Sequence, residues 1–277
     1  RRIRQLGLTC LAFPGAEHTR LSHALGAAHV MKLFIAPLRQ LHESLPFWQR
    51  LTSERARDAL AAALLHDVGH GPLSHLFEDA LSYSQRMVSG MTEADAKRHE
   101  DWTETILLDD STGVHRVLVA ADPDLPRRVA GLIHGEHPLP YLARAVSGTF
   151  DVDRCDYLLR DAHATGVIYG NYDLPWLLST LRFNDADAGD CPGLAIDGAK
   201  GLSAIESFVL ARLFMFQQVY FHKATRAAEW LVRMILTRAL ALLREGVRLP
   251  DPPKALAAVA REATQTEAIL RPHLGAE

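Results

Sequence analysis

Three histidines and an aspartate stand close together just after an apolar segment near position 65. Residues 61–65 are apolar, His66 and Asp67 follow directly, and His70 and His75 come within the next eight positions. Imidazole and carboxylate groups are good ligands for divalent metals such as Mn, Fe, Zn and Mg. His66 and Asp67 alone are more often a buried histidine beside a capping aspartate, but four titratable side chains within ten positions are costly to bury without a ligand. The spacing therefore favours a metal or phosphate site.

A second group, Arg20 and His23, lies at the start of a predicted helix over residues 21–33. Residues three apart share one face of a helix. A helix N-terminus with an arginine is suited to phosphate binding, and His23 adds an imidazole that can bind metal. Taken alone, such residues are usually solvated, so this segment needs support from elsewhere in the chain.

A third group lies on a predicted helix over residues 150–164, where Asp153, Tyr157 and either Asp161 or Arg160 recur at intervals of about four. This interval places them on one helical face. One interpretation is a charged face exposed to solvent. The apolar residues between them indicate instead that the helix is packed, with its polar face toward a site.

Two further segments contain polar or aromatic residues that do not indicate a functional site by themselves. His99 lies in a polar stretch, where a surface position is the usual interpretation. Arg212, Tyr220 and Lys223 place basic and aromatic groups along one long predicted helix near the C-terminal third of the chain. These residues gain meaning only from the segments described above.

The elements that must position these groups are helices. Apolar periodicity predicts helices over residues 21–33, 53–67, 73–81, 99–108, 125–134, 150–164, 203–221 and 225–245, with Ser53 as an N-cap. Residues 82–98 are expected to be a polar loop, and a last amphipathic helix is expected after residue 253. We predict an all-α fold with at most a small β-hairpin near 182–200. The chain is expected to form a single domain over 1–277, with a core in 1–180 and a C-terminal helical part over 201–277 that completes a substrate pocket.

The composition bounds the class of protein. The chain has 277 residues, of which 48% are hydrophobic and 23% charged, values that are ordinary for a soluble globular protein. The formal net charge of −3 gives no reason to expect a nucleic-acid binder. Three scattered cysteines argue for a reducing compartment, and neither an uninterrupted apolar run of about 18 residues nor a signal peptide is seen. We therefore expect a cytoplasmic protein without a membrane partner; because the chain starts at Arg1, the sequence leaves open a preceding segment.

Taken in order, these segments resemble the HD-domain phosphohydrolases, and most closely the deoxynucleoside triphosphate (dNTP) triphosphohydrolases, a family that includes the vertebrate SAM-and-HD-domain enzyme. The family pattern H…HD…D is matched by His23, His66-Asp67 and Asp153. The longer strings that carry the resemblance are residues 5–7, 13–26, 66–75 and 151–161. The likeness covers roughly residues 3–166 and returns at 220–223.

The resemblance implies an HD-domain helical fold and one divalent metal ion (Mn, Fe, Mg, Co or Zn), of which Mn is the one expected first. The implied metal ligands are His23, His66, Asp67 and Asp153. The implied catalytic residues are His70, His99, Glu78 and Arg20. In this scheme His70 and His99 lie beside the scissile bond, and one of them, ordered by Glu78, protonates the leaving 5′-oxygen.

The resemblance also implies a deoxynucleoside triphosphate as the substrate. The residues expected to bind it are Gln5, Leu6, Arg20, His75, Arg154, Tyr157, Asp161, Arg212, Tyr220 and Lys223. Arg20 would contact the α-phosphate, while Arg154, Arg212 and Lys223 would contact the β- and γ-phosphates. Gln5, Leu6, Tyr157 and Asp161 would form the deoxyribose pocket, with His75 on the same wall.

The chain departs from the vertebrate enzyme at two of these positions. Phe221 stands where that enzyme has a polar residue that reads the base, so the base preference does not carry over. Glu78 stands where it has aspartate, one methylene shorter. Family members are dimers, tetramers or hexamers, which implies a homo-oligomer and leaves a nucleotide activator open.

Three functions are compatible with this sequence. The first is metal-dependent hydrolysis of dNTPs to deoxynucleoside and tripolyphosphate. The second is another HD-type phosphohydrolase activity, on nucleoside monophosphates, cyclic dinucleotides or alarmones. The third is a non-catalytic nucleotide-binding module, which the complete set of implied ligands and histidines argues against. We favour the first.

Overall fold

The computed structural model describes residues 2–73, 75–80, 82, 98–184, 191–248 and 250. These residues are mostly helical, as the sequence predicts, and include one two-stranded sheet. The first half of the chain contains η1 (Thr9–Leu11), α1 (Arg20–Leu41), η2 (His42–Ser44), η3 (Phe47–Gln49), α2 (Ser53–Leu65), α4 (His99–Leu108), α5 (Gly113–Ala121) and α6 (Leu125–Ile133). The second half contains α7 (Pro140–Val146), α8 (Val152–Thr165), α9 (Leu174–Ser179), β1 (Leu181–Asn184), β2 (Gly193–Ile196), α10 (Leu202–Met215), η5 (Phe216–Tyr220) and α11 (Lys223–Arg244). Residues 75–80 form a further short helical segment.

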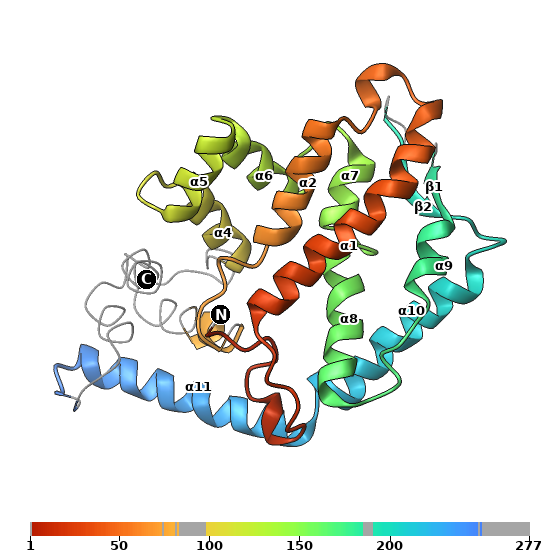
Figure 1. Ribbon diagram of the computed structural model, residues 1–277. Helices are drawn as coiled ribbons and strands as arrows, with labels where there is room; N and C mark the ends of the chain where they lie inside the picture. The colour runs from red at the N-terminus through yellow and green to blue at the C-terminus, as the bar shows by residue number, and fades with distance from the viewer. Residues whose placement is uncertain are drawn as a thin grey trace.

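The central element is α1, which runs diagonally through the molecule and packs against α2 and α8 (Figure 1). It begins at Arg20 because Thr19 and Ser22 form a capping box, in which each backbone N–H donates to the other residue's hydroxyl. The helix continues past the predicted end at residue 33, through Pro37. Its later turns are retained because Phe34 and Leu38 are fully buried there, and such burial contributes about 1.5–3 kcal/mol per side chain.

The hydrophobic core gathers around α1 and extends into the C-terminal part of the chain. Its largest fully buried side chains include Phe34 on α1, Tyr141 on α7 and Leu158 on α8. Phe208 and Met215 of α10 belong to the same cluster. Helix α10, in the C-terminal part of the chain, therefore shares one core with the N-terminal helices. This shared core holds the start of η5, which follows α10 directly.

Several predicted helices are confirmed within one or two residues at each end, among them α4, α6 and α8. The cap of α2 is Thr52 rather than Ser53, because the Thr52 hydroxyl accepts the backbone N–H of Arg55. The short helices α5, α7 and α9 were not predicted, since six to nine residues show too little periodicity. Most of the predicted loop 82–98 and the predicted helix after residue 253 lie outside the described residues.

The predicted hairpin near 182–200 is confirmed, and its first strand starts at Leu181. β1 and β2 pair antiparallel, with Leu181 opposite Ile196 and Asn184 opposite Gly193. Leu181 and Gly193 are buried, while the other strand residues are partly exposed. This small sheet lies at the end of α1 away from the sites described below (Figure 1).

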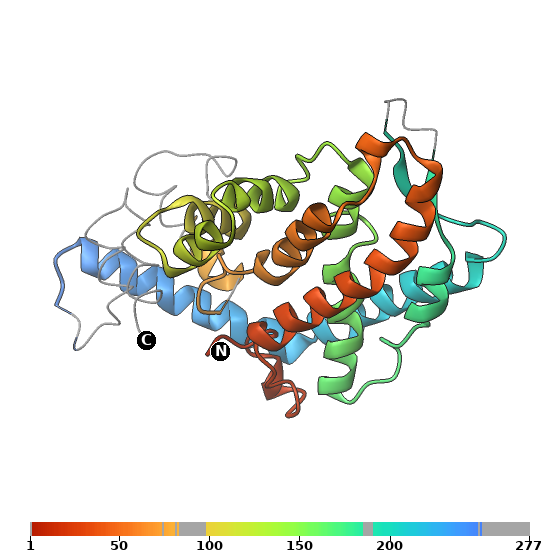
Figure 2. The ribbon, with the colours of Figure 1, turned by 45° about the horizontal axis from the view of Figure 1, so that its top comes forward.

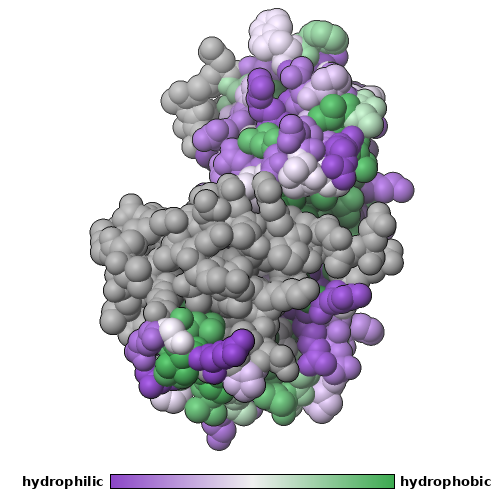
Figure 3. Space-filling model, turned by 90° about the vertical axis from the view of Figure 1, so that its left-hand side faces the viewer, coloured by the Kyte–Doolittle hydropathy of each residue, from purple (hydrophilic) through white to green (hydrophobic). Residues whose placement is uncertain are grey.

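The predicted helix over 203–221 is divided into α10 and the π-helical turn η5, after which α11 runs along one edge of the molecule (Figure 2). Single π-turns are rare and occur frequently at functional sites. Apolar side chains of α11, among them Trp230 and Ile235, are exposed, and Figure 3 shows apolar surface between charged groups in the lower part of the molecule, where α11 lies.

Two stretches, Arg20–Ser44 and Leu202–Tyr220, are long and apolar enough to cross a membrane by length and composition alone. Core helices of globular proteins pass the same test, and α1 is such a helix because it packs between α2 and α8. The absence of a membrane partner remains a prediction from the sequence.

Candidate metal centre and substrate pocket

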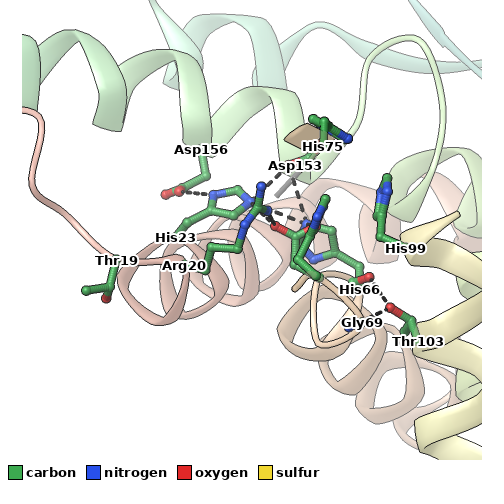
Figure 4. A network of polar contacts seen from close by, with 12 residues as sticks. Thr19, Arg20, His23, His66, Gly69, His75, His99, Thr103, Asp153 and Asp156 are labelled. Carbon is green, nitrogen blue, oxygen red and sulfur yellow. Dashed lines mark hydrogen bonds and ion pairs between the residues drawn. The ribbon is translucent and has the colours of Figure 1, made fainter. Parts of the chain in front are cut away.

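The structure brings the four predicted metal ligands together from three elements, and Figure 4 shows His23, His66 and Asp153 among them. His23 comes from α1, His66 and Asp67 from the turn that ends α2, and Asp153 from the first turn of α8. His23 Nε2 lies 2.9 Å from Asp153 Oδ1 and 3.3 Å from His66 Nε2. His66 Nε2 lies 3.5 Å from Asp67 Oδ1. The ligand atoms of His23, His66 and Asp67 all lie within 4.8 Å of one another, and Asp153 joins them through its contacts with His23 and His66.

The side chains of His66 and Asp67 converge because helix α2 ends just before them, at Leu65. Adjacent residues of a continuing helix point about 100° apart, but α2 ends at Leu65 and the chain enters a series of turns. The backbone N–H of Val68 donates to the carbonyl of Leu65, and that of His70 to the carbonyl of Asp67. These turns place both side chains on the side that faces α1 and α8.

The Nδ1 atoms of His23 and His66 each have a hydrogen-bond partner on the side away from the carboxylates of Asp67 and Asp153. His23 Nδ1 lies 2.8 Å from Asp156 Oδ2, and His66 Nδ1 lies 2.9 Å from the carbonyl oxygen of Ala63. Because Nδ1 donates to these acceptors, the Nε2 atoms are directed toward Asp67 and Asp153. Two imidazole nitrogens and two carboxylates, with a carboxylate behind one imidazole, suit a divalent cation. The residues present therefore fit a metal ion.

Burial and charge oppose one another at this centre. Burial lowers the pKa of His23, but hydrogen bonds to Asp153 and Asp156 outweigh it and raise the pKa to about 10. Burial also lowers the pKa of His66, but the negative charges of Asp67 and Asp153 outweigh burial and raise this pKa to about 9. Burial also raises the pKa of the Asp153 carboxyl, yet hydrogen bonds from His23 and His66 hold it below the usual range. The carboxylates thus stay ionised and favour positive charge at this point.

Asp156 and Arg160 form a support behind His23. Arg160 donates to both carboxylate oxygens of Asp156, at 2.8 Å from Nε and 2.8 Å from Nη2. This pair lies directly against Gly26 of α1, where a Cβ atom would collide with both side chains. Glycine at position 26 therefore lets α8 approach closely enough for Asp156 to reach His23.

We expect Asp156→Asn to weaken metal binding by about 10- to 100-fold, because the substitution removes the charge that orients and polarises His23. Titration of the apoprotein with Mn²⁺ measures the change. Asp110→Asn, at an exposed position outside the site, is the matched control. Equal Mn²⁺ affinity in the parent protein and Asp156→Asn would show that Asp156 does not act on the metal centre.

A second cluster of three histidines and a glutamate adjoins the first. His70 Nδ1 lies 3.2 Å, His75 Nδ1 3.3 Å and His99 Nδ1 3.6 Å from the carboxylate oxygens of Glu78. The rings of His70 and His99 are stacked, with centroids 3.8 Å apart. His70 also links the two clusters, because its Nε2 lies 3.4 Å from Asp67 Oδ1. The predicted grouping of His70, His99 and Glu78 is thus present in the structure.

Burial raises the pKa of the Glu78 carboxyl, but contacts with His70, His75 and His99 outweigh it and bring the pKa below its usual range. An ionised Glu78 stabilises a proton on a neighbouring imidazole. Two stacked imidazoles that share one carboxylate can hold a proton and release it to a bound ligand.

Gly69 allows α4 to deliver His99 to this cluster. The backbone N–H of Gly69 donates to the Thr103 hydroxyl at 3.0 Å, and that hydroxyl donates to the carbonyl of His66 at 3.0 Å. A Cβ atom at position 69 would collide with the backbone of α4 at His99 and Thr103. The turn after α2 and the start of α4 therefore pack backbone against backbone.

We expect Gly69→Ala to destabilise the protein by about 1–3 kcal/mol, since the added methyl must push α4 away. The displaced His99 should lower kcat by about 10²-fold, as misplacement on the order of 1 Å does. Urea unfolding and steady-state kinetics measure the two effects. Gly113→Ala is the control, because a Cβ there meets no atom. A Gly69→Ala protein with the unfolding free energy and the kcat of its parent would show that the position of α4 does not depend on Gly69.

Both clusters open into one cavity of about 700 Å³. The predicted residues that line it are Gln5, Leu6, Arg20, Asp67, His70, His75, His99, Asp153, Tyr157, Asp161 and Tyr220. Asp161 is buried, and its two carboxylate oxygens contact His18 Nε2 at 2.7 Å and the Tyr220 hydroxyl at 2.9 Å. Arg20 contacts Asp67 through Nη1, so this guanidinium lies between the metal centre and the open cavity.

Three predicted phosphate contacts are absent from the lining of this cavity. Arg154 is held at the start of α8, where its guanidinium contacts Asp151 and the carbonyl of Gly148. Arg212 lies over the ring of Phe216, at 5.6 Å from its centroid. Lys223, the first residue of α11, does not line it either.

The sequence reasoning missed residues that the structure adds to the site. His18 and Asp156 lay within the recognised strings but were given no role. The cavity is also lined by Arg226, Glu229, Trp230 and Arg233 of α11. Their spacing of three, four and seven residues places them on one helical face, and this was the signal available in the sequence.

Comparison with known proteins identifies the family. Residues 20–159 match the HD domain, and residues 173–271 match the HD associated region. A solved structure of a phosphohydrolase (BT4208) from Bacteroides thetaiotaomicron has a TM-score of 0.76 and 31% identity to the chain, over 98% of the chain and 61% of that structure.

Curated proteins give the same result. YwfO of Bacillus subtilis, described as uncharacterized, is 38% identical over 91% of this chain and 52% of its own length. The deoxynucleoside triphosphate triphosphohydrolase SAMHD1 homolog of Dictyostelium discoideum is 26% identical over 91% of this chain and 46% of its own length. The chain thus spans about half the length of these relatives. The HD-domain match covers half of the chain and includes His23, His66, Asp67 and Asp153, and the chain belongs to the HD-domain family.

Proposed function

We propose that this protein is a metal-dependent phosphohydrolase that converts dNTPs to deoxynucleoside and tripolyphosphate. One observation carries the proposal. The cavity that holds Asp67, Asp153, His70 and His99 is the same cavity that Asp161 lines. A ligand in it therefore meets a metal centre, a proton donor and a buried carboxylate for a hydroxyl group.

The protein residues assigned to the metal are His23, His66, Asp67 and Asp153. A divalent cation held there would lower the pKa of water and polarise a phosphoryl oxygen. Arg20 contacts Asp67 and also lines the cavity, so we assign it to the α-phosphate. Arg233 of α11 also lines the cavity and supplies further positive charge.

In the proposed reaction a water oxygen forms a bond to the α-phosphorus while the bond from that phosphorus to the 5′-oxygen breaks. The leaving 5′-oxygen takes a proton from the His70–His99 pair. Glu78 contacts both imidazoles and stabilises the protonated form before the transfer. General-acid catalysis of this kind typically contributes about 10²- to 10⁴-fold.

The sugar end of the cavity favours a deoxyribose. Asp161 is fixed by His18 and Tyr220, so its carboxylate is positioned to accept a 3′-hydroxyl. Tyr157 also lines the cavity and packs edge-on against Tyr220, with ring centroids 6.0 Å apart. We assign its ring to the space where a 2′-hydroxyl would project.

Relatives support this assignment at a distance. The SAMHD1 proteins of Dictyostelium discoideum and Danio rerio, named as deoxynucleoside triphosphate triphosphohydrolases, are 26% and 29% identical to the chain. We further propose that the protein is a cytoplasmic homo-oligomer and that Mn²⁺ supports its activity. Assays with and without a second dNTP test whether a nucleotide activator is required.

The test is a substrate panel. The protein is incubated with dGTP, dGMP and ppGpp in separate reactions with Mn²⁺, Mg²⁺, Fe²⁺ or Co²⁺, and products are separated by chromatography. The proposal expects tripolyphosphate and deoxyguanosine from dGTP. Turnover of dGMP or ppGpp without tripolyphosphate release from dGTP would instead identify another HD-type phosphohydrolase. Binding of dGTP without turnover under every metal would indicate a non-catalytic module.

A further inference from the structure

An aromatic surface leads from the sugar end of the cavity to α11. The ring of Phe216 lies 5.1 Å from the ring of Tyr220 and 5.5 Å from that of Phe221. All three rings line the cavity, and the Tyr220 hydroxyl donates a hydrogen bond to the Asp161 carboxylate. A nucleotide whose sugar meets Asp161 can therefore place its base against Phe216 and Phe221. Aromatic rings there offer a stacking surface for any base.

One polar pair borders this aromatic surface. The Arg226 guanidinium lies 5.9 Å from the centroid of the Phe221 ring, and Arg226 Nη1 donates to Glu229 Oε2 at 2.8 Å. Both residues line the cavity. The Glu229 side chain is 25% exposed and that of Arg226 60%. The carboxylate is thus partly covered, and the guanidinium presents further N–H groups beyond the one it donates to Glu229.

We propose that Arg226 and Glu229 read the base, and that the base they select is guanine. This inference rests on the proposed function. Guanine presents two acceptors, O6 and N7, next to two donors, N1–H and N2–H₂. Arginine donates to O6 and N7 as a bidentate pair, and a carboxylate accepts from N1–H and N2–H₂.

The other bases match this pair less well. Adenine has an acceptor at N1, which would face the Glu229 carboxylate with one lone pair against another. Cytosine offers one exocyclic amino group to the carboxylate, and thymine offers one ring N–H between two carbonyls. Among the four bases, guanine alone places two adjacent donors beside two adjacent acceptors.

The test compares dGTP with dITP, which lacks only the 2-amino group. In the parent protein, kcat/KM for dGTP should exceed that for dITP by about tenfold, because dITP leaves one Glu229 contact unmade. In Glu229→Gln this ratio should fall to near one, and dATP should gain relative to dGTP, since an amide can pair with adenine. Glu136→Gln, exposed and outside the cavity, is the matched control and should keep the parent ratio.

A second variant examines the guanidinium. Arg226→Lys loses the bidentate donor, so 7-deaza-dGTP, which lacks N7, should be disfavoured relative to dGTP in the parent protein but not in this variant. Equal rates for dGTP and dITP in the parent protein, or an unchanged ratio in Glu229→Gln, would overturn the inference and leave Arg226–Glu229 as a surface ion pair. Hydrolysis of dNTPs without base preference would keep the proposed function intact. Absence of any dNTP hydrolysis would remove both.

Discussion

An Asp67→Ala variant is expected to lose its bound metal and about 10³-fold of its kcat/KM or more. Asp67 has a side chain that is only 10% exposed, lies within 3.8 Å of both His66 Nε2 and His23 Nε2 and contacts Arg20. Burial raises the pKa of its carboxyl, but His66, His70 and Arg20 outweigh burial and hold the pKa well below the usual range. Its removal therefore takes away a permanent negative charge, not only one ligand atom.

Elemental analysis of the purified variant measures the metal, and release of tripolyphosphate from a dNTP measures the activity. Asp110→Ala is the control, because that aspartate is exposed and lies outside the cavity. His66→Ala should show the same double loss. Stoichiometric metal together with parental activity in the Asp67→Ala protein would prove the ligand assignment wrong.

The second large effect is expected at the histidine pair. His70→Gln should lower kcat by about 10²- to 10⁴-fold while bound metal stays close to the parent value, because His70 serves as proton donor rather than as ligand. Glu78→Gln should lower kcat as well, since its carboxylate contacts both His70 and His99. The double variant should be little worse than the worse single variant, because the residues act as a unit.

His134→Gln is the control for these variants. His134 lies at the end of α6, outside the cavity, and has a partly exposed ring beside Glu104. Steady-state kinetics and elemental analysis are measured on the same preparations. If His70→Gln lost metal and activity in parallel, His70 would belong to the metal centre and the division between the two clusters would fail.

The grouping of His23, His66, Asp67 and Asp153 was predictable because each of them lies in a short, distinctive string. His66 and Asp67 follow an apolar helix, and Asp153 lies in the first turn of another, just after a capping aspartate. The residues that support this group were not predictable in the same way. His18 meets Asp161 across 143 positions, and Asp156 reaches His23 only because Gly26 leaves room. Contacts of this kind depend on how helices approach, which local patterns do not specify.

The same limit applies to the residues that the resemblance assigned to the phosphates. Arg154, Arg212 and Lys223 do not line the cavity, whereas Arg226 and Arg233 of α11 do. α11 begins at Lys223, after His222, whose backbone (ψ 129°) ends the helical segment formed by α10 and η5. The direction that α11 takes after this break decides which of its side chains face the cavity. Motif spacing does not specify that direction.

In the reaction we propose, water attacks the α-phosphorus of a dNTP at the centre formed by His23, His66, Asp67 and Asp153. Hydrolysis of dGTP in ¹⁸O-labelled water, followed by mass spectrometry of both products, locates the bond that is cleaved. We expect one ¹⁸O atom in the tripolyphosphate and none in the deoxyguanosine, with no product when His66→Ala replaces the parent protein. Label in the deoxyguanosine, or dGMP and pyrophosphate in place of tripolyphosphate, would show that water attacks elsewhere.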